Sequence, residues 1–175
     1  SVSGTNTLTG CVGTKSIHIS TIPSPVLQII ATATNLCIGD SVAVSVTGAP
    51  NYTWSSGVVN GVYFSPTVSQ LYTVSANSAS SNCVAQSTVQ INVNPLPTVQ
   101  ITASDTLICV GEEIVLTGMG ATTYTWNTGF IGTNYPVIPA FGQTFSVQAT
   151  DANGCKGQAS FSPNLTECLG LQING

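Results

Sequence analysis

Hydrophobic and polar residues alternate along most of this chain in short runs. Residues 87–93 show this most clearly, since Val89 and Ile91 fall on one side and Gln90 and Asn92 on the other. A period of two predicts a β-strand with one buried face. No segment combines the 3.6-residue period of a helix with capping residues. The chain is therefore expected to be all-β.

Other short apolar runs predict the remaining strands, and turn-forming residues separate them. The expected strands are residues 26–31, 41–47, 99–103 and 113–117, together with two segments that contain Tyr-Thr-Trp. Residues 80–82 and 151–154 are turn sequences, each followed directly by a cysteine. About seven short strands, a buried Trp and a cysteine pair together predict an immunoglobulin-like sandwich.

The pattern repeats after 72 residues. The sequence Cys-x-Gly-[Asp/Glu] at residues 37–40 returns at residues 109–112, and the Tyr-Thr-Trp segment that ends at Trp54 returns at Trp126. A fixed period of this kind predicts tandem units. Trp54 and Trp126 are expected to be the core aromatic residues of those units rather than exposed platforms for a ligand.

The period divides the chain into four segments. They are the C-terminal hairpin of a preceding, incomplete repeat (1–22), a first Ig-like domain (23–95), a second Ig-like domain (96–163) and a C-terminal tail (164–175). Closely spaced prolines near residues 23 and 95 should end sheet pairing and form short, stiff connectors. In the second unit Pro163 aligns with Ile91, so its last strand is expected to be broken there.

The six cysteines indicate disulfides in an oxidising compartment, because their spacings do not match metal-binding patterns. Cys37 and Cys83 are 46 positions apart, and so are Cys109 and Cys155. We expect each pair to close within its own unit, as a staple for a domain too small to be very stable alone.

Cys11 and Cys168 are left over by this pairing and are expected to be unpaired or to bond between units. One interpretation is an intermolecular bond between Cys168 of one copy and Cys11 of the next. The alternatives are partners beyond this sequence and, for Cys168, a bridge to a nearby loop.

The charge content excludes several classes of partner. The chain has only 2 Lys and no Arg against 6 acidic residues, for a net charge of −4. A nucleic acid or an anionic lipid surface would find no cationic patch here. The longest apolar runs are of strand length, so no insertion into a membrane is expected.

Candidate catalytic and metal-binding groups are sparse. The single histidine, His18, is expected on the outer face of a strand, and the adjacent Glu112 and Glu113 should point to opposite faces. Asp151 and Asn153 offer too few oxygens in one hairpin for calcium. We expect no catalytic residue, no cofactor and no metal.

Three motifs resemble a known group of repeats. Besides Cys-x-Gly-[Asp/Glu], the chain carries Tyr-Thr-Trp-Ser-Ser-Gly at 52–57 and Thr-Asp-Ala-Asn-Gly-Cys at 150–155. They resemble the PKD-like and Ig-like tandem repeats of large secreted proteins of Bacteroidota. The resemblance implies export by the type IX pathway, display outside the cell or on its surface, and a role in adhesins, gliding filaments or spacers beside enzymes.

The same resemblance suggests a modification. Ser41 and Thr106 each follow an aspartate and precede an apolar residue, which resembles the Asp-[Ser/Thr]-hydrophobic acceptor of Bacteroidota O-glycosylation. We expect these two hydroxyls to be the glycan sites of a glycoprotein.

Three functions fit the sequence. The first is a non-enzymatic stalk or filament segment of an adhesin-like protein, whose partners are neighbouring Ig-like repeats. The second is a self-assembling extracellular fibre subunit, completed by strand addition from an identical subunit. The third is a glycan-binding module appended to an exported enzyme, with surface glycans as its ligands.

Overall fold

A computed structural model describes residues 1–21, 23–78 and 83–168, and the regular structure in them is strand apart from one short 3-10 turn at Ser55–Gly57. Residues 80–82, expected as a turn, lie outside the described residues. So do residue 22 of the expected first segment and residues 169–175 of the expected tail. The all-β prediction is confirmed.

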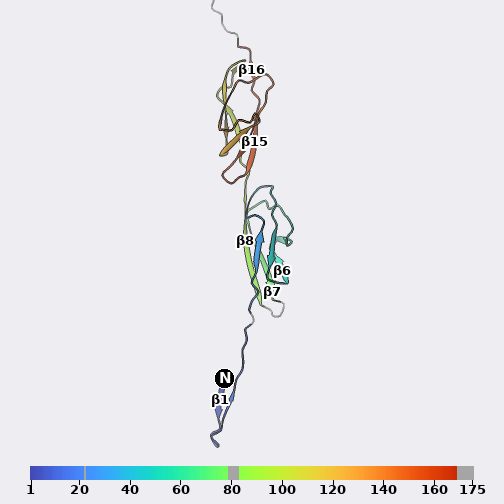
Figure 1. Cartoon of the computed structure of the whole chain (residues 1–175), viewed down its shortest axis with the longest axis vertical. Helices are drawn as coiled ribbons and strands as arrows, with labels where there is room; N and C mark the ends of the chain where they lie inside the picture. The colour runs from blue at the N-terminus through green and yellow to red at the C-terminus, as the bar shows by residue number, and fades with distance from the viewer. Residues whose placement is uncertain (22, 79–82, 169–175) are drawn as a thin grey trace, which may run out of the picture.

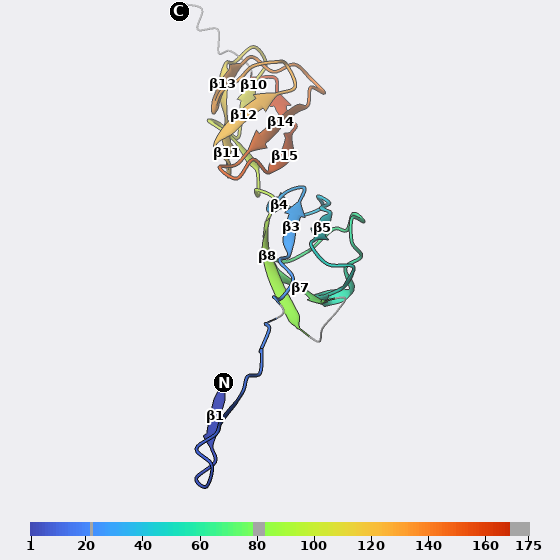
Figure 2. The ribbon, with the colours of Figure 1, turned by 60° about the horizontal axis from the view of Figure 1, so that its bottom comes forward.

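The described chain forms an N-terminal hairpin and two sandwiches that follow one another along one long axis (Figure 1). The hairpin pairs β1 (Val2–Thr5) with β2 (Val12–Lys15), and the described residues between it and the first sandwich, 16–21 and 23–27, contain no strand. Turning the molecule keeps the same order of hairpin, first sandwich and second sandwich (Figure 2).

The first sandwich has two sheets that face each other. One pairs β3 (Gln28–Ala31) with β5 (Val44–Thr47), and the other has the order β4 (Asn35–Cys37), β8 (Val84–Asn94), β7 (Gln70–Asn77), β6 (Asn51–Trp54). All pairs are antiparallel except β4 with β8, which run parallel. This mixture of antiparallel sheets and one parallel edge strand gives the Ig-like topology.

The second sandwich repeats this plan. One sheet has the order β13 (Asn134–Val137), β11 (Ile114–Met119), β9 (Gln100–Ala103), and the other β12 (Thr123–Trp126), β14 (Phe145–Thr150), β15 (Lys156–Phe161). The parallel pair is β10 (Ile108–Cys109) with β16 (Leu165–Thr166).

Each sandwich has its own core around one Trp. Trp54 is 7% exposed and donates its indole N–H to Asn60 Oδ1 at 3.3 Å. Trp126 is 2% exposed and donates to the Gly132 carbonyl at 3.0 Å. Burying an indole requires a partner for its N–H, and both have one. The two Trp side chains are therefore packing residues, as expected from their place in the repeat.

The last strand differs between the two sandwiches. β8 runs without a break from Val84 to Asn94, whereas β15 ends at Phe161 and β16 starts only at Leu165. Pro163 lies buried between them, and its missing N–H cannot join the ladder. The predicted break is confirmed.

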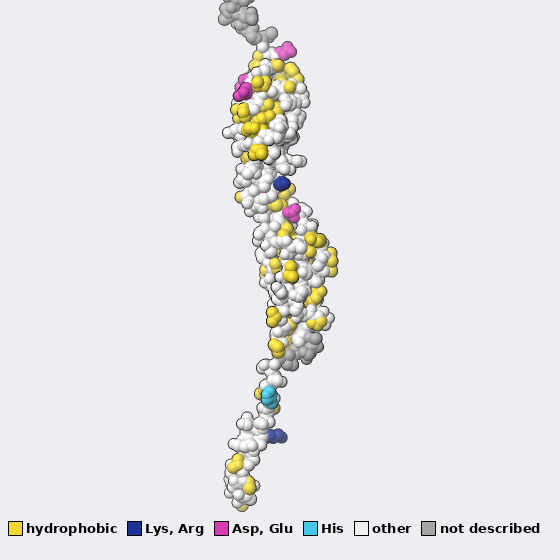
Figure 3. Space-filling model, viewed as in Figure 1, with side chains coloured by type: hydrophobic (Ala, Val, Ile, Leu, Met, Phe, Trp, Pro, Cys, Tyr) yellow, Lys and Arg dark blue, Asp and Glu magenta, His cyan; other side chains and the backbone are white. Residues whose placement is uncertain are grey.

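The molecule has few charged side chains on the face shown in Figure 3, where polar uncharged atoms surround scattered apolar ones. Among the residues that the structure describes, no helix has the length and apolar character needed to cross a membrane.

Candidate functional site

The two disulfides do not follow the pairing expected from the sequence. Cys37 is bonded to Cys155, 118 positions away, and Cys109 is bonded to Cys168, 59 positions away. The predicted bonds of Cys37 to Cys83 and of Cys109 to Cys155 are therefore wrong. One bond joins the two sandwiches to each other, and the other lies within the second sandwich.

The parallel pairing of β4 with β8 explains why Cys37 cannot reach Cys83. Cys37 lies opposite Asn94, the last residue of β8, whereas Cys83 directly precedes the first. They are separated along β8 by 11 positions (94 minus 83). At about 3.3 Å a residue this is roughly 35 Å, while a disulfide needs Cα atoms about 4.4–6.8 Å apart.

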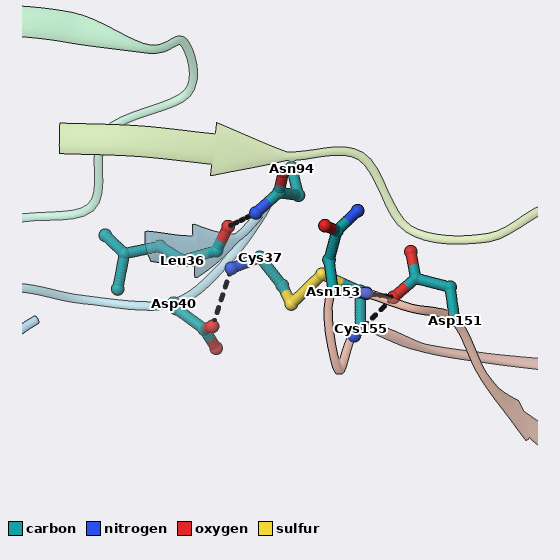
Figure 4. Close-up of a disulfide and its surroundings, with 7 residues drawn as sticks. All are labelled: Leu36, Cys37, Asp40, Asn94, Asp151, Asn153 and Cys155. Atoms are coloured by element: carbon teal, nitrogen blue, oxygen red, sulfur yellow. Dashed lines mark hydrogen bonds between the residues drawn. A yellow bond between two sulfur atoms is a disulfide. The ribbon is translucent and has the colours of Figure 1, made fainter. Parts of the chain in front are cut away.

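A tight turn presents Cys37 at the end of the first sandwich (Figure 4). The Cys37 N–H donates to Asp40 Oδ2 at 2.9 Å, and the Asp40 N–H donates back to the Cys37 carbonyl at 3.0 Å. Gly39 between them has a φ of +96°, which strongly favours glycine. The Cys-x-Gly-[Asp/Glu] motif thus closes a turn rather than supplying a carboxylate for chemistry.

The end of β8 fixes this turn in place. Ile38 N–H donates to the Asn94 carbonyl at 2.9 Å, and the Asn94 side-chain amide donates to the Leu36 carbonyl at 3.2 Å. Because Asn94 is followed directly by Pro95, these bonds hold Cys37 at the point where the chain leaves the first sandwich.

The hairpin between β14 and β15 presents Cys155 from the other side. Asp151 Oδ1 accepts the N–H groups of Asn153 and Cys155, both at 2.8 Å, and the Asp151 N–H donates to the Cys155 carbonyl at 2.9 Å (Figure 4). Gly154 has a φ of +85°. Cys155 is fully buried, so the interdomain disulfide is shielded at this end from solvent and reductants.

The linker between the sandwiches runs past this hairpin. Pro95 and Leu96 are exposed and Pro97 is half-buried. A shallow groove at the joint is lined by Leu96 and Pro97 of the linker and by β14 and β15 residues Gln148, Lys156, Gly157 and Gln158. The peptide linker and the disulfide are thus two separate covalent connections between the same two bodies.

The second sandwich has the same turn with a different bond. The Cys109 N–H donates to Glu112 Oε2 at 2.9 Å, and the Glu112 N–H donates to the Cys109 carbonyl at 3.1 Å. Cys109 lies opposite Thr166, just as Cys37 lies opposite Asn94. Its partner Cys168 is two residues past Thr166, so Cys168 is not the leftover cysteine that the sequence suggested.

The other residues singled out from the sequence remain at the surface. Cys11, His18, Ser41, Thr106 and Glu113 are exposed, and Cys11 takes part in neither disulfide. The structure does not bring these five side chains into one site.

The described residues also lack a metal-binding cluster. Within residues 1–21, 23–78 and 83–168, no three His, Cys, Asp or Glu side chains come together in an arrangement that could hold a metal ion. The oxygens of Asp40, Glu112 and Asp151 described above accept backbone N–H groups in turns.

A polar groove crosses the β12–β14–β15 sheet. It is lined by side chains that include Asn127, Gln148, Gln158 and Ser160, and Trp126 lies beneath it. Because Trp126 is 2% exposed, its ring is not available as a stacking platform for a sugar. Any glycan bound in this groove would rely on the amides and hydroxyls alone.

No protein-family model matches the sequence, and the comparison with curated proteins found no match. Among solved structures, the chain is similar to murine CEACAM1b, with 11% identity and a TM-score of 0.40 over 81% of this chain and 100% of that one.

It is also similar to the N-terminal four Ig domains of Dscam1 isoform 4.4, with 13% identity and a TM-score of 0.28 over 93% of this chain and 53% of that one. A third is SGBP-B of the Bacteroides ovatus mixed-linkage glucan utilization locus, solved with a mixed-linkage heptasaccharide. It has 17% identity and a TM-score of 0.27 over 84% and 48%. The chain spans about half the length of these two. The Ig-like assignment rests on the sheet topology described above.

Proposed function

We propose that this chain is a non-enzymatic structural segment, a stalk or filament section of an extracellular adhesin-like protein. The observation that carries the proposal is the Cys37–Cys155 bond, which links consecutive sandwiches at the joint where a flexible stalk would otherwise bend. A second covalent connection beside the linker restricts bending and twisting of one sandwich against the other. Such bracing serves a molecule that must hold a distal part at a distance.

The bond also changes the path of a pulling force. Tension applied at the two ends of the chain reaches Cys37, crosses the sulfur atoms and continues from Cys155. The peptide backbone between these cysteines, including β5 to β8 and most of the second sandwich, then lies outside the covalent path of the tension.

Disulfides indicate an oxidising compartment, which supports a location outside the cell or on its surface. The motifs shared with Bacteroidota repeats extend the proposal to type IX export and PKD-like arrays. Exposed Ser41 and Thr106 remain the predicted glycan sites. Intact-mass measurement of protein purified from its native source tests them, since the bare peptide mass would remove that part of the proposal.

Single-molecule pulling tests the mechanical role. With the disulfides intact, the chain should extend only by the segments before Cys37 and after Cys155. Reduction should release the 118 positions between them. At about 3.4 Å a residue, the contour length should grow by roughly 400 Å. Equal extension before and after reduction would show that the bond does not carry the load, and the proposal would fail.

The fibre-subunit alternative loses its covalent form, because Cys168 is bonded to Cys109 and is not available for Cys11 of another copy. Strand addition to the β1–β2 hairpin remains as a non-covalent version. Electron microscopy separates it from the stalk, since a subunit gives open-ended polymers and a stalk gives rods of defined length. The glycan-binding alternative remains as a role for the polar groove over β12, β14 and β15.

A further inference from the structure

Three hairpins end in a cysteine whose backbone carbonyl accepts an N–H from the residue that directly follows the preceding strand. The N–H of Asn6 donates to the Cys11 carbonyl at 2.9 Å, that of Ser78 to the Cys83 carbonyl at 3.0 Å, and that of Asp151 to the Cys155 carbonyl at 2.9 Å. Each cysteine is thus the residue at which the chain rejoins its partner strand after the turn. The cysteines are spaced 72 positions apart.

The first and third hairpins share further detail. Asn6 Oδ1 accepts the N–H groups of Leu8 and Thr9, at 3.0 and 3.2 Å, much as Asp151 Oδ1 accepts two N–H groups in its own turn. Gly10, directly before Cys11, has a φ of +69°, and Gly154, directly before Cys155, has a φ of +85°. Cys11, like Cys155, thus follows a positive-φ glycine in a turn closed by a side-chain oxygen, although the loop that ends at Cys11 is one residue longer.

The strand register is the same in the first two hairpins, whereas β14–β15 is offset by one residue, with Val147 opposite Ala159. In β1–β2, Val2 lies opposite Lys15, and in β7–β8 the residues 72 positions later, Val74 and Ser87, lie opposite each other. The two hairpins differ in burial, however, since Val2 of β1 is 70% exposed and the corresponding Val74 of β7 is 0% exposed. The N-terminal hairpin therefore has the geometry of the last two strands of a sandwich, and none of the strands that the structure describes covers it.

At one of the three hairpins the partner is visible. Cys155 is bonded to Cys37, which a Cys-x-Gly-Asp turn holds at the far end of the preceding sandwich. The Cα atoms are 5.5 Å apart, in the ordinary range for a disulfide. The hairpin cysteine of one sandwich thus receives the opening cysteine of the sandwich before it.

We propose that this link is the rule of the array, and that Cys11 and Cys83 are attachment points of the same kind. Each takes a disulfide from the Cys-x-Gly-[Asp/Glu] turn of the Ig-like unit that precedes the unit to which its hairpin belongs. The sandwiches are then connected by a ladder of disulfides that runs beside the polypeptide. The inference concerns covalent assembly and does not depend on the function proposed above.

The chemistry of each link is a two-electron oxidation. Two thiols lose their protons, one sulfur–sulfur bond forms, and a small-molecule disulfide such as oxidised glutathione accepts the two electrons and two protons as its own bond breaks to give two thiols.

Cys168 has a distinct place in this scheme. The turn around Cys109 matches that around Cys37 and faces the corresponding end of its own sandwich, but Cys168 already occupies its sulfur. A unit with this bond offers no opening cysteine to a following hairpin. Cys168 therefore acts as a cap that stops the ladder from propagating forward.

An added unit tests the rule in the full chain. A second copy of residues 24–95, inserted directly after Pro95 and marked beside its two cysteines by Ile38→Val and Val84→Ile, creates a new joint from sequences already present. The protein is refolded with oxidised and reduced glutathione, and its disulfides are mapped on non-reduced peptides. We expect the first-copy Cys37 to be bonded to the second-copy Cys83, and the second-copy Cys37 to Cys155.

Two matched variants sharpen the result. Cys83→Ser in the second copy should leave the first-copy Cys37 open to alkylation, whereas Cys83→Ser in the first copy should leave both interdomain bonds unchanged. A bond between Cys37 and Cys83 of the same copy would overturn the proposal, and so would an unbonded first-copy Cys37. Failure of the inserted unit to fold beside its intact twin also counts against it.

A second design completes the N-terminal hairpin. Residues 24–72 placed directly before Ser1 supply the strands that β1 and β2 lack, in the 72-residue register. The added Cys37 should then be bonded to Cys83, while Cys11 remains open to alkylation. A bond from the added Cys37 to Cys11, or none, would overturn the rule independently of the inserted-copy experiment.

Discussion

Gly157 faces Pro97 so closely that it has no room for a side chain. A Cβ on Gly157 would lie 2.5 Å from the Pro97 carbonyl oxygen and 2.7 Å from Val99 Cγ2. The end of the linker therefore packs against β15 at Gly157, which is two residues from Cys155 of the interdomain disulfide. The approach of backbone to backbone fixes where the second sandwich begins.

Replacing Gly157 should weaken the packing of the linker against β15. Gly157→Ala forces the linker away from β15, and we expect a loss of about 1–3 kcal/mol in the stability of the second sandwich. Thermal unfolding followed by Trp fluorescence measures it. Gly13→Ala is the matched control, since Gly13 is also a strand glycine and nothing lies within 4 Å of its added Cβ. Equal shifts in melting temperature for both variants would contradict the close packing of Gly157 against Pro97.

Removal of the Cys109–Cys168 bond and removal of the Cys37–Cys155 bond should have different effects. Cys109→Ser and Cys168→Ser each open a loop of 59 positions within one sandwich, and loop-closure entropy predicts a loss of about 4 kcal/mol. Cys155→Ser should instead leave both cores folded and widen the distribution of angles between them. Chemical denaturation measures the first effect and small-angle X-ray scattering the second. A rod as rigid in Cys155→Ser as in the unaltered protein would be inconsistent with bracing.

Asp151 should govern how fast the interdomain bond forms. Asp151→Ala removes the acceptor of two N–H groups, which we expect to cost about 1–3 kcal/mol in the hairpin. Asp151→Asn keeps an oxygen in the same place and should lose less. Alkylation of thiols during refolding from the reduced state follows the rate at which Cys155 is consumed. The order of the two variants is the critical result, and a slower Asn variant would refute the role.

Tyr72 should make the first sandwich sensitive to alkali. Burial raises the pKa of its phenol, because the phenolate is poorly solvated in the core. Since the folded pKa lies above the unfolded value, the unfolded chain loses the proton first. The contribution of Tyr72 is complete below its ordinary pKa of about 10 and is lost as the pH rises through the folded pKa.

Urea unfolding between about pH 9 and pH 11 measures this slope. With Tyr72→Phe, the unfolding free energy of the first sandwich should depend less steeply on pH in this range. Tyr63→Phe is the control variant, since it removes the hydroxyl of a tyrosine that is 63% exposed.

The strands and cores could be predicted because local alternation reports burial directly. Val89 and Ile91 lie toward the core and Gln90 and Asn92 away from it, as their spacing indicates. Trp54 and Trp126 could be assigned to packing because they recur in register. Pro163 ended its strand because a missing N–H acts at one residue, whatever surrounds it.

The disulfide pairing could not be predicted in this way. Equal spacing of Cys37 to Cys83 and of Cys109 to Cys155 reports the length of the repeat, and it is the same whether bonds form within units or between them. The deciding fact is that β4 pairs with the far end of β8, which depends on tertiary structure. The one available signal was the length of the alternating run after Cys83, which carries the chain far from its start.

The two bonds interleave along the sequence, since Cys109 of the second lies between Cys37 and Cys155 of the first. A single peptide cleavage anywhere between Cys37 and Cys168 therefore leaves both fragments attached through at least one pair of sulfur atoms. Outside a cell, where proteases meet exposed loops, a nick in either sandwich between these two cysteines releases no part of the protein. The same arrangement that braces the joint also keeps a damaged molecule in one piece.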